Sequence, residues 1–481
     1  MAIDLLRGLA DRFYQEGNWA SALNLYRNVL ATDAGASAEL GYRLAIGHCE
    51  IELADPATLG GLALEADAPS GSERERIIAA RLRLRARDLC RAGDAARAAR
   101  LLRLLATCDP PIAEAYAAAI DAPPSTAAPA AGDRDPPFLG DLADLDVEAV
   151  KRRMRGLRVL LGFRRFYYDM PERRYEPPDL FARSAAAFGL TVDALDLSAL
   201  EQDTAGLATA LYERINEFRP DVIVYEGLFT AGASAVDETV ASHVGTVLDV
   251  ARRYLGVRVV KCVLDAWRVP ADRLFRGVGS VVDLVHHGHP AILERVGDAT
   301  RRVFCYVPPL DLPTPTAEAG SLPGACFAGT ISAASIARLV WWAEAGARNL
   351  PIRFYETDAA APAERPDTAF ADLHRAHQLC VNFTRRSGGA PILTWRTIQT
   401  LLAGGVLLEE RSRDSAHFLK PGIHYEEFAT IAELAAVMER LLGDPEARAR
   451  LAAAGAAWAR RYFTGDYFWA GLLDRLLAGG R

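Results

Sequence analysis

Hydrophobic and polar positions divide the chain into a helical first part and a longer region where short apolar runs alternate with amphipathic segments. Residues 17–33 (GNWASALNLYRNVLATD) and 93–109 (GDAARAARLLRLLATCD) share one spacing. Each begins with glycine, has a small residue five positions later (Ala22 and Ala98), and then carries bulky side chains at helical spacing. A glycine turn followed by a small residue, where two helices approach, is typical of a helix-turn-helix repeat.

The repeated spacing resembles that of tetratricopeptide repeats. We therefore expect residues 1–120 to form a short all-α array of this kind, with an ordinary helical domain as the alternative. Stacked helix pairs leave an extended groove, so such an array would recruit a partner or acceptor. Residues 121–138 are rich in Pro and Ala and predict a linker.

Buried strands alternate with helices after the linker. Runs such as 221–225 (DVIVY) and 257–264 (VRVVKCVL) predict strands of a parallel sheet with right-handed crossovers. The fold class expected is therefore α/β, with two Rossmann-like halves over 139–315 and 316–481 that face a cleft. Ligands of such sheets bind beyond the carboxyl ends of the strands, so the chemistry should lie on the loops that follow them.

Composition and charge narrow the function classes. The 481 residues are 51% hydrophobic and 24% charged, as in soluble globular proteins, and a net charge of −7 lacks the basic field that nonspecific nucleic-acid binding needs. The seven cysteines are scattered without a C-x-x-C pair, which favours reduced thiols. No signal-peptide core or membrane-spanning run occurs, so we expect a cytoplasmic protein.

A glycine loop in the second half predicts a phosphate-binding site. Ser387, Gly388 and Gly389 follow a strand that ends near Asn382 and precede a helix expected to begin at Pro391. Backbone N–H groups approach a ligand closely where no Cβ intervenes, and the positive end of a helix attracts a diphosphate. Further contacts are expected from Arg385, Arg386, Arg396, Gln399, Gly329 and Thr330.

The order of these residues resembles the C-terminal half of GT-B glycosyltransferases, closest to the bacterial group with a spore-coat-protein-like or group-1-like C-terminal domain. The positions that carry the resemblance are Phe327 to Thr330, Arg396, Gly404-Gly405, Phe418, Pro421-Gly422 and Glu433-Leu434. It covers residues 323–475 and implies a metal-independent enzyme that moves a sugar from a nucleotide-diphosphate donor and needs no further cofactor. The donor-binding residues that it implies are Gly329, Thr330, Asn382, Arg385, Ser387, Gly388, Gly389, Arg396, Gln399 and Glu410.

One position departs from the family pattern. The R-x-x-E motif places a carboxylate on the donor ribose, but this chain has Gln399 there. An amide accepts fewer charge-assisted hydrogen bonds, so the donor is held more weakly, or Glu409 or Glu410 substitutes, or the site does not turn over. Two alternatives therefore remain open: a nucleotide-sugar epimerase of the same fold, and a non-catalytic repeat scaffold with a degenerate transferase half.

The first half should supply the catalytic base and the acceptor contacts. Asp265 closes an apolar strand, which suits a general base as well as a structural cap. His286, His287 and His289 follow another strand. Because strand neighbours point to opposite faces, we expect no shared metal ion. We predict His287 as a second catalytic residue, with strand-end packing as the alternative.

Acceptor contacts are expected from aromatic and acidic side chains that follow two other strands. Tyr167 and Tyr168 lie in a loop rich in arginines and aromatics, and Glu226 ends the strand DVIVY. His374 and His377 lie three residues apart on a predicted helix and are expected on the surface.

Overall fold

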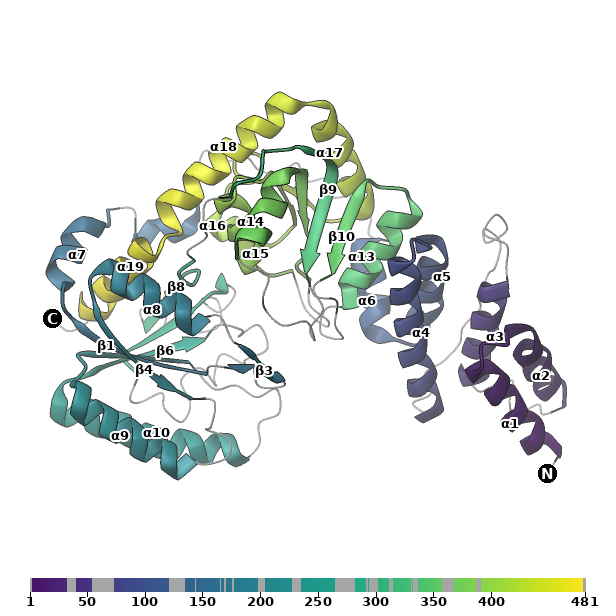
Figure 1. Cartoon of the computed structure of the whole chain (residues 1–481), viewed down its shortest axis with the longest axis horizontal. Coiled ribbons are helices and arrows are strands. Elements are labelled where there is room, and N and C mark those ends of the chain that lie inside the picture. The colour runs from purple at the N-terminus through teal and green to yellow at the C-terminus, as the bar shows by residue number, and fades with distance from the viewer. Residues whose placement is uncertain are drawn as a thin grey trace.

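The computed structural model arranges a helical array and two α/β halves along the long axis of the molecule (Figure 1). The residues that it describes are 2–32, 40–53, 73–120, 135–142, 144–164, 166–167, 170–174, 177–197, 204–226, 235–263, 282–290, 293, 302–310, 315–329, 331, 336–356, 367–385 and 391–478. Within these ranges, no helix combines the length and the apolar character needed to cross a membrane.

The N-terminal part is all-helical where it is described. Its helices are α1 (Ala2–Gln15), α2 (Trp19–Thr32), α3 (Leu40–Leu53), α4 (Glu73–Arg91), α5 (Ala95–Ala106) and α6 (Pro110–Ala119). Gly17 and Gly93 have φ of 74° and 84°, a conformation that glycine adopts without strain, and each turns the chain into the next helix. Ala22 and Ala98 are fully buried. The predicted helix-turn-helix spacing is therefore confirmed at both places, whereas its assignment to tetratricopeptide repeats stays a prediction.

The first α/β half contains a parallel sheet with strand order β4-β1-β5-β6-β7-β8. Its strands are β1 (Arg158–Phe163), β4 (Thr191–Asp196), β5 (Val222–Glu226), β6 (Arg258–Val263), β7 (Leu284–His287) and β8 (Val303–Cys305), and a separate ribbon pairs β2 (Phe166–Tyr167) with β3 (Met170–Arg174). The accompanying helices are α7 (Val147–Met154), α8 (Pro177–Phe188), α9 (Thr204–Phe218) and α10 (Ala235–Leu255), with a short 3-10 helix, η3 (Pro137–Asp141), ahead of them. Every residue of β5 is buried, as expected for a strand covered on both faces.

The second half contains a parallel sheet with strand order β10-β9-β11-β12-β13. Its strands are β9 (Leu322–Gly329), β10 (Ile352–Glu356), β11 (His377–Asn382), β12 (Leu407–Glu410) and β13 (Glu426–Phe428). Its helices are α13 (Ile336–Ala347), α14 (Asp367–Ala376), α15 (Trp395–Leu402), α16 (Arg413–Phe418), α17 (Ile431–Gly443) and α18 (Pro445–Tyr462). The α/β prediction for both halves is therefore confirmed.

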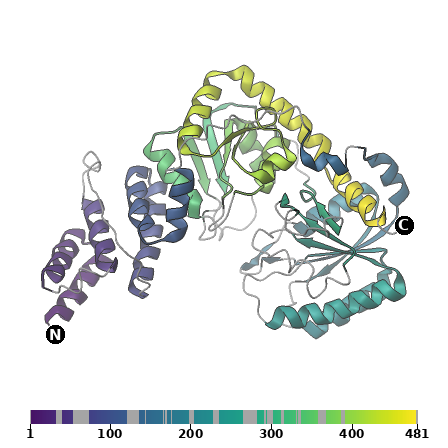
Figure 2. The same ribbon diagram turned by 180° about the vertical axis from the view of Figure 1, so that it is seen from behind.

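The last helix, α19 (Gly465–Ala478), leaves the second half and packs on the first, beside α7 and α8 (Figures 1 and 2). The indole Nε1 of Trp469 donates to Ser184 at 2.9 Å. Lys151 on α7 forms an ion pair with Asp466 on α19. The C-terminal segment therefore connects the two halves, and aromatic side chains of both halves share one core.

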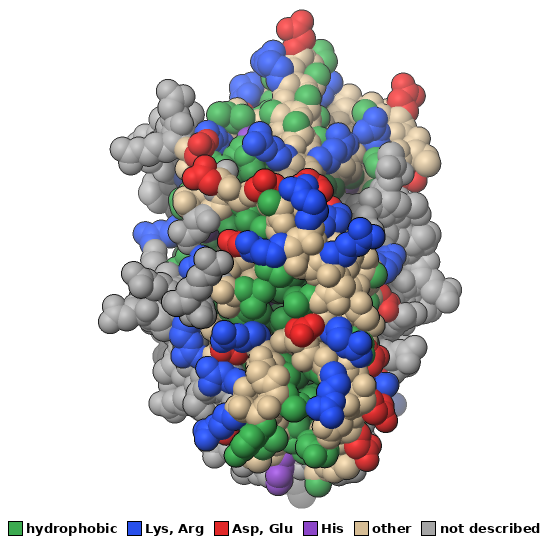
Figure 3. All heavy atoms as spheres, turned by 90° about the vertical axis from the view of Figure 1, so that its left-hand side faces the viewer, with side chains coloured by type: hydrophobic (Ala, Val, Ile, Leu, Met, Phe, Trp, Pro, Cys, Tyr) green, Lys and Arg blue, Asp and Glu red, His purple; other side chains and the backbone are tan. Residues whose placement is uncertain are grey.

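The face of the molecule that carries α7 mixes basic, acidic and hydrophobic side chains (Figure 3).

The helical array docks on the second half through α13. Ile336, Leu339, Val340 and Ala343 of α13 belong to the same apolar core as the buried residues of α1 to α6. At the predicted linker the structure describes only residues 135–138, so most of it lies outside the described residues. The array is nevertheless held to the second half by packing, because residues of α13 and of the array share one apolar core.

Candidate functional site

Three strands of the second sheet bring candidate donor residues to one edge. Gly329 ends β9, Asn382 ends β11 and Glu410 ends β12, and these strands are neighbours in the parallel order. Asn382 lies opposite Glu409 in the register of β11 and β12. The carboxyl ends of parallel strands meet at one edge of the sheet, which is where ligands bind in this class of fold.

Asn382 is the centre of a buried polar cluster. Its Nδ2 donates to Glu409 Oε2 at 2.8 Å and lies within 3.0 Å of the hydroxyls of Thr394 and Thr397. Its Oδ1 accepts a hydrogen bond of 2.8 Å from Nη1 of Arg396. The amide therefore fixes the guanidinium of Arg396 at the carboxyl end of the sheet.

Glu409 is fully buried beneath this cluster. Burial raises its pKa to about 8, and the hydrogen bonds from Asn382, Thr397 and Ser415 only partly oppose that rise. Both carboxyl oxygens are engaged inside the protein. Glu409 therefore holds Asn382, Thr397 and Ser415 in place through hydrogen bonds inside the protein.

Arg396 and Gly329, both predicted to bind the donor, lie in close contact. A Cβ added at Gly329 would lie 2.4 Å from Nη2 of Arg396, so a side chain there would displace the guanidinium from this position. The guanidinium carbon lies 5.1 Å from the ring centroid of Phe327, within the range of a cation–π contact. Asn382, Phe327 and Gly329 thus pack around and orient the side chain of Arg396.

Glu410 holds the start of the loop that follows β11. It is fully buried and accepts hydrogen bonds of 2.9 Å from the backbone N–H groups of Thr384 and Arg385. Nε of Arg385 donates to its other oxygen at 3.0 Å. Glu410 therefore reaches Arg385 and the backbone, and the predicted donor contact of this carboxylate stays a prediction.

The helix expected from Pro391 begins four residues later, so that boundary was wrong. Pro391 pairs with Arg385 in an isolated bridge, and its carbonyl accepts a hydrogen bond of 3.0 Å from Ser412 Oγ. The N-cap of α15 is Thr394, whose N–H is satisfied by the Thr397 hydroxyl at 3.4 Å. These contacts keep the segment extended, and the positive end of α15 lies at Thr394.

Other candidates of the second half fall into two groups. Gln399 is partly exposed on α15, three residues after Arg396. The residues predicted for donor binding that lie outside the described part are Thr330, Arg386, Ser387, Gly388 and Gly389. Their roles therefore stay predictions.

The acceptor candidates are described only in part. Glu226 is buried and binds Arg164, whose Nη2 donates to it at 2.9 Å and whose N–H donates at 3.2 Å. Tyr167 lies on β2, whereas Tyr168 and the base candidate Asp265 fall outside the described residues. The contact between Arg164 and Glu226 joins the ends of β1 and β5, because Arg164 follows β1 and Glu226 ends β5.

His287 ends β7 and is buried, with its Nδ1 accepting a hydrogen bond of 2.9 Å from the N–H of His289. His286 contacts Cys262 and the carbonyl of Tyr306 in the core. Among the described residues no group of three or more His, Cys, Asp or Glu could hold a metal ion. The three histidines therefore occupy different surroundings.

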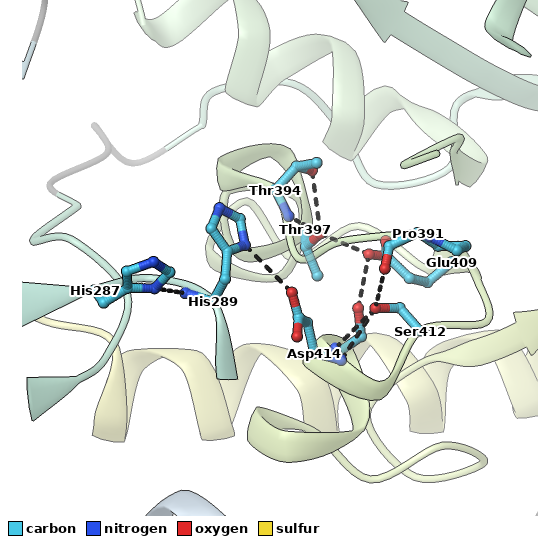
Figure 4. A network of polar contacts seen from close by, with 9 residues as sticks. His287, His289, Pro391, Thr394, Thr397, Glu409, Ser412 and Asp414 are labelled. Atoms are coloured by element: carbon cyan, nitrogen blue, oxygen red, sulfur yellow. Dashed lines mark hydrogen bonds and ion pairs between the residues drawn. The ribbon is translucent and has the colours of Figure 1, made fainter. Parts of the chain in front are cut away.

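Two residues not predicted as a pair connect the halves. His289 of the first half and Asp414 on α16 of the second point toward one another, with Nδ1 and Oδ2 3.2 Å apart (Figure 4). Asp414 N–H donates to the N-cap hydroxyl of Ser412 at 3.1 Å. A side-chain contact between residues 125 positions apart leaves no local signal in the sequence.

Comparisons with known proteins give one family match. Residues 335–477 match the model of a family described as glycosyl transferase-like. This segment contains Asn382, Arg396 and Glu409, and it ends within α19. No curated protein sequence matches the chain.

Several solved structures resemble the chain at low identity. HepE of Anabaena, determined in complex with UDP and glucose, is 10% identical with a TM-score of 0.46, covering 68% of this chain and 100% of HepE. Sucrose-phosphate synthase of Thermosynechococcus elongatus is 12% identical with a TM-score of 0.46, covering 68% of this chain and 100% of the synthase. A glycosyltransferase of Rickettsia africae is 9% identical with a TM-score of 0.44, covering 67% and 99%. By sequence, then, residues 335–477, which include Asn382, Arg396 and Glu409, are similar to a glycosyl transferase-like family.

Proposed function

We propose that this chain is a GT-B glycosyltransferase that moves a sugar from a nucleotide-diphosphate donor to an acceptor. The observation that carries the proposal is the coincidence of the family match with the site: Arg396, Asn382 and Gly329 meet at the carboxyl edge of the second sheet. An oriented guanidinium beside a helix N-terminus suits a diphosphate leaving group, because both offset its negative charge.

The leaving diphosphate needs positive charge and donors in fixed positions. In our proposal Arg396 and Arg385 supply the charge, and the glycine loop of residues 387–389 supplies backbone N–H groups. No metal ion is part of this scheme, so turnover should persist in EDTA. Loss of turnover in EDTA, restored by added Mg²⁺, would contradict the metal-independent form of the proposal.

The acceptor is proposed to bind the first half, beside Glu226 and the loop of Tyr167 and Tyr168. A protein or surface glycan recruited by the helical array fits the docking of that array on α13 of the donor half. Sugar transfer to a candidate acceptor can be compared between the wild-type chain and variants with substitutions on the surface of the array. Slower transfer by these variants would support recruitment by the array.

The direct test measures both binding and turnover. Wild-type protein is titrated with UDP by calorimetry and incubated with UDP-glucose, GDP-mannose and dTDP-glucose while release of nucleoside diphosphate is followed. Arg396→Ala should weaken diphosphate binding or turnover about tenfold to a hundredfold. Arg440→Ala, which removes a surface arginine paired with Glu426 on the same half, is the matched control and should change neither.

One observation favours a second candidate, a scaffold that binds nucleotide sugar without turnover. Gln399 stands where the family places the carboxylate, and both Glu409 and Glu410 are engaged in the interior. Binding by the wild type without turnover of any of the three nucleotide sugars would favour the scaffold.

A further inference from the structure

The contact between His289 and Asp414 joins the carboxyl edges of the two sheets. His289 follows β7 by two residues, and Asp414 lies in the first turn of α16, just after β12. The carboxyl edges of parallel sheets are where substrates bind, and the two edges belong to different halves. This pair therefore lies where a reaction between a donor and an acceptor would take place.

Hydrogen-bond chemistry fixes which nitrogen of His289 carries the hydrogen. A carboxylate only accepts, so Nδ1 of His289 donates to Oδ2 of Asp414 across 3.2 Å. Nε2 of a neutral ring then holds the lone pair, and Figure 4 shows that side of the ring turned away from Asp414. The side chain of His289 is 10% exposed. A carboxylate that holds an imidazole in this tautomer prepares Nε2 to accept a proton.

The neighbouring His287 has the opposite arrangement. Its Nδ1 accepts the N–H of His289, so the hydrogen of a neutral ring is on Nε2, which is buried. This ring accepts through Nδ1 and so supports the turn that presents His289 (Figure 4). Of the two histidines, His289 therefore has the geometry of a base.

A chain of polar contacts links His289 to the donor residues. Ser412 Oγ accepts the N–H groups of both Asp414 and Ser415, and Ser415 Oγ donates to Glu409 at 3.0 Å. Glu409 in turn accepts from Asn382, which holds Arg396. The orienting carboxylate of His289 thus belongs to the same packed network as the proposed diphosphate contact.

We propose that His289 is the general base of the transfer and that Asp414 positions it from the opposite half. This inference rests on the proposed function. The acceptor hydroxyl gives its proton to Nε2 while its oxygen bonds to the anomeric carbon. The bond from that carbon to the diphosphate breaks, and its electron pair leaves with the nucleoside diphosphate beside Arg396. The imidazolium that forms is stabilised by Asp414 and later returns the proton to solvent.

The experiment uses the full chain and water as the acceptor. Hydrolysis of UDP-glucose, GDP-mannose and dTDP-glucose is measured for wild type, His289→Gln, His289→Gly, Asp414→Asn and the control His243→Gln, which replaces an exposed histidine on α10, and the Kd for UDP is measured for each. We expect His289→Gln and His289→Gly to lower kcat about a hundredfold or more at unchanged Kd. Added imidazole should restore part of the turnover of His289→Gly, which a purely structural role would not allow. Asp414→Asn should lower kcat by a smaller factor at unchanged Kd.

The outcomes separate this inference from the proposed function. Turnover by His289→Gln within threefold of wild type overturns the base, and so does a loss of UDP affinity that matches the loss of turnover. A wild type that binds UDP-glucose without hydrolysing any of the three donors also overturns the base, although donor binding then stands. A wild type that binds neither UDP nor any of the three nucleotide sugars overturns the proposed function itself.

Discussion

Arg103 on α5 donates two hydrogen bonds to the carboxylate of Glu344 on α13, at 2.9 and 3.1 Å. Glu344 is buried, and Arg348 contacts the same carboxylate from the next turn of α13. Burial alone would raise the pKa of Glu344, but the hydrogen bonds from Arg103 and Arg348 outweigh it and lower the pKa. The pair therefore connects the helical array to the second half through an ion pair whose carboxylate is buried and whose guanidinium is half exposed.

Arg103→Ala should destabilise the protein, because it removes two charge-assisted hydrogen bonds from a buried carboxylate. We expect a loss of about 1–2 kcal/mol in the free energy of unfolding, limited by the remaining Arg348 and by the exposure of half of the Arg103 side chain. Urea denaturation measures the change. The control is Arg12→Ala, which breaks an exposed pair within α1 and should cost less than about 0.5 kcal/mol. Equal losses in both variants would contradict the role of this contact.

The close approach of α13 and α5 gives a second prediction. A Cβ on Gly346 would lie 2.4 Å from the Cβ of Ala95. Alanine ordinarily stabilises a helix interior relative to glycine by about 1 kcal/mol, whereas overpacking costs about 1–3 kcal/mol. Gly346→Ala should therefore destabilise the wild type but stabilise a protein that already carries Ala95→Gly. A double-mutant cycle in urea measures this coupling, and an effect of Gly346→Ala of the same sign in both backgrounds would refute it.

Periodic patterns gave most of the fold. The spacing after Gly17 and Gly93 predicted two turns whose glycines have positive φ and whose alanines are buried, because that conformation and close helix contact select these residue types. Apolar runs such as β5 and β6 predicted the first sheet. By contrast, Pro391 favours a helix start locally, but it bridges to the nearby Arg385 and accepts a hydrogen bond from Ser412, 21 residues later, and the helix starts at Trp395.

The sequence predicted the positions of individual side chains less well than the order of helices and strands. His374 and His377 were expected on the surface, and this was wrong: both are buried, with His374 bonded to the Thr400 hydroxyl at 2.7 Å and His377 to Tyr355 at 3.0 Å. The helix α14 ends at Ala376 and His377 begins β11, so the helical spacing assumed for this pair does not hold. Gly329 and Arg396 were predicted together through the order of motifs, and their contact follows from the neighbouring strands.

Glu409 predicts how stability depends on pH. Its pKa in the folded protein is raised to about 8 from 4.5, mainly by burial. The unfolded chain therefore loses its proton first as the pH rises, so this group lowers the free energy of unfolding between about pH 4.5 and pH 8, by up to about 1.4 kcal/mol per pH unit. Glu409→Gln removes this contribution. Urea denaturation at pH 5, 6.5 and 8 should give a flatter profile for the variant than for the wild type, and parallel profiles would contradict the buried, protonated carboxyl.

Gln399 offers the sharpest test of how this site holds a nucleotide. It lies three residues after Arg396 on α15 and is partly exposed, so a carboxylate can be placed there without entering the core. If the position faces the ribose of the donor, Gln399→Glu should tighten UDP binding about tenfold, because a carboxylate accepts stronger hydrogen bonds from hydroxyls than an amide does. The gain should vanish with 2′,3′-dideoxy-UDP, which lacks both hydroxyls. Gln15→Glu on the distant α1 controls for the added charge. An equal gain with the dideoxy nucleotide, or a loss of affinity with both, would show that Gln399 does not face the ribose.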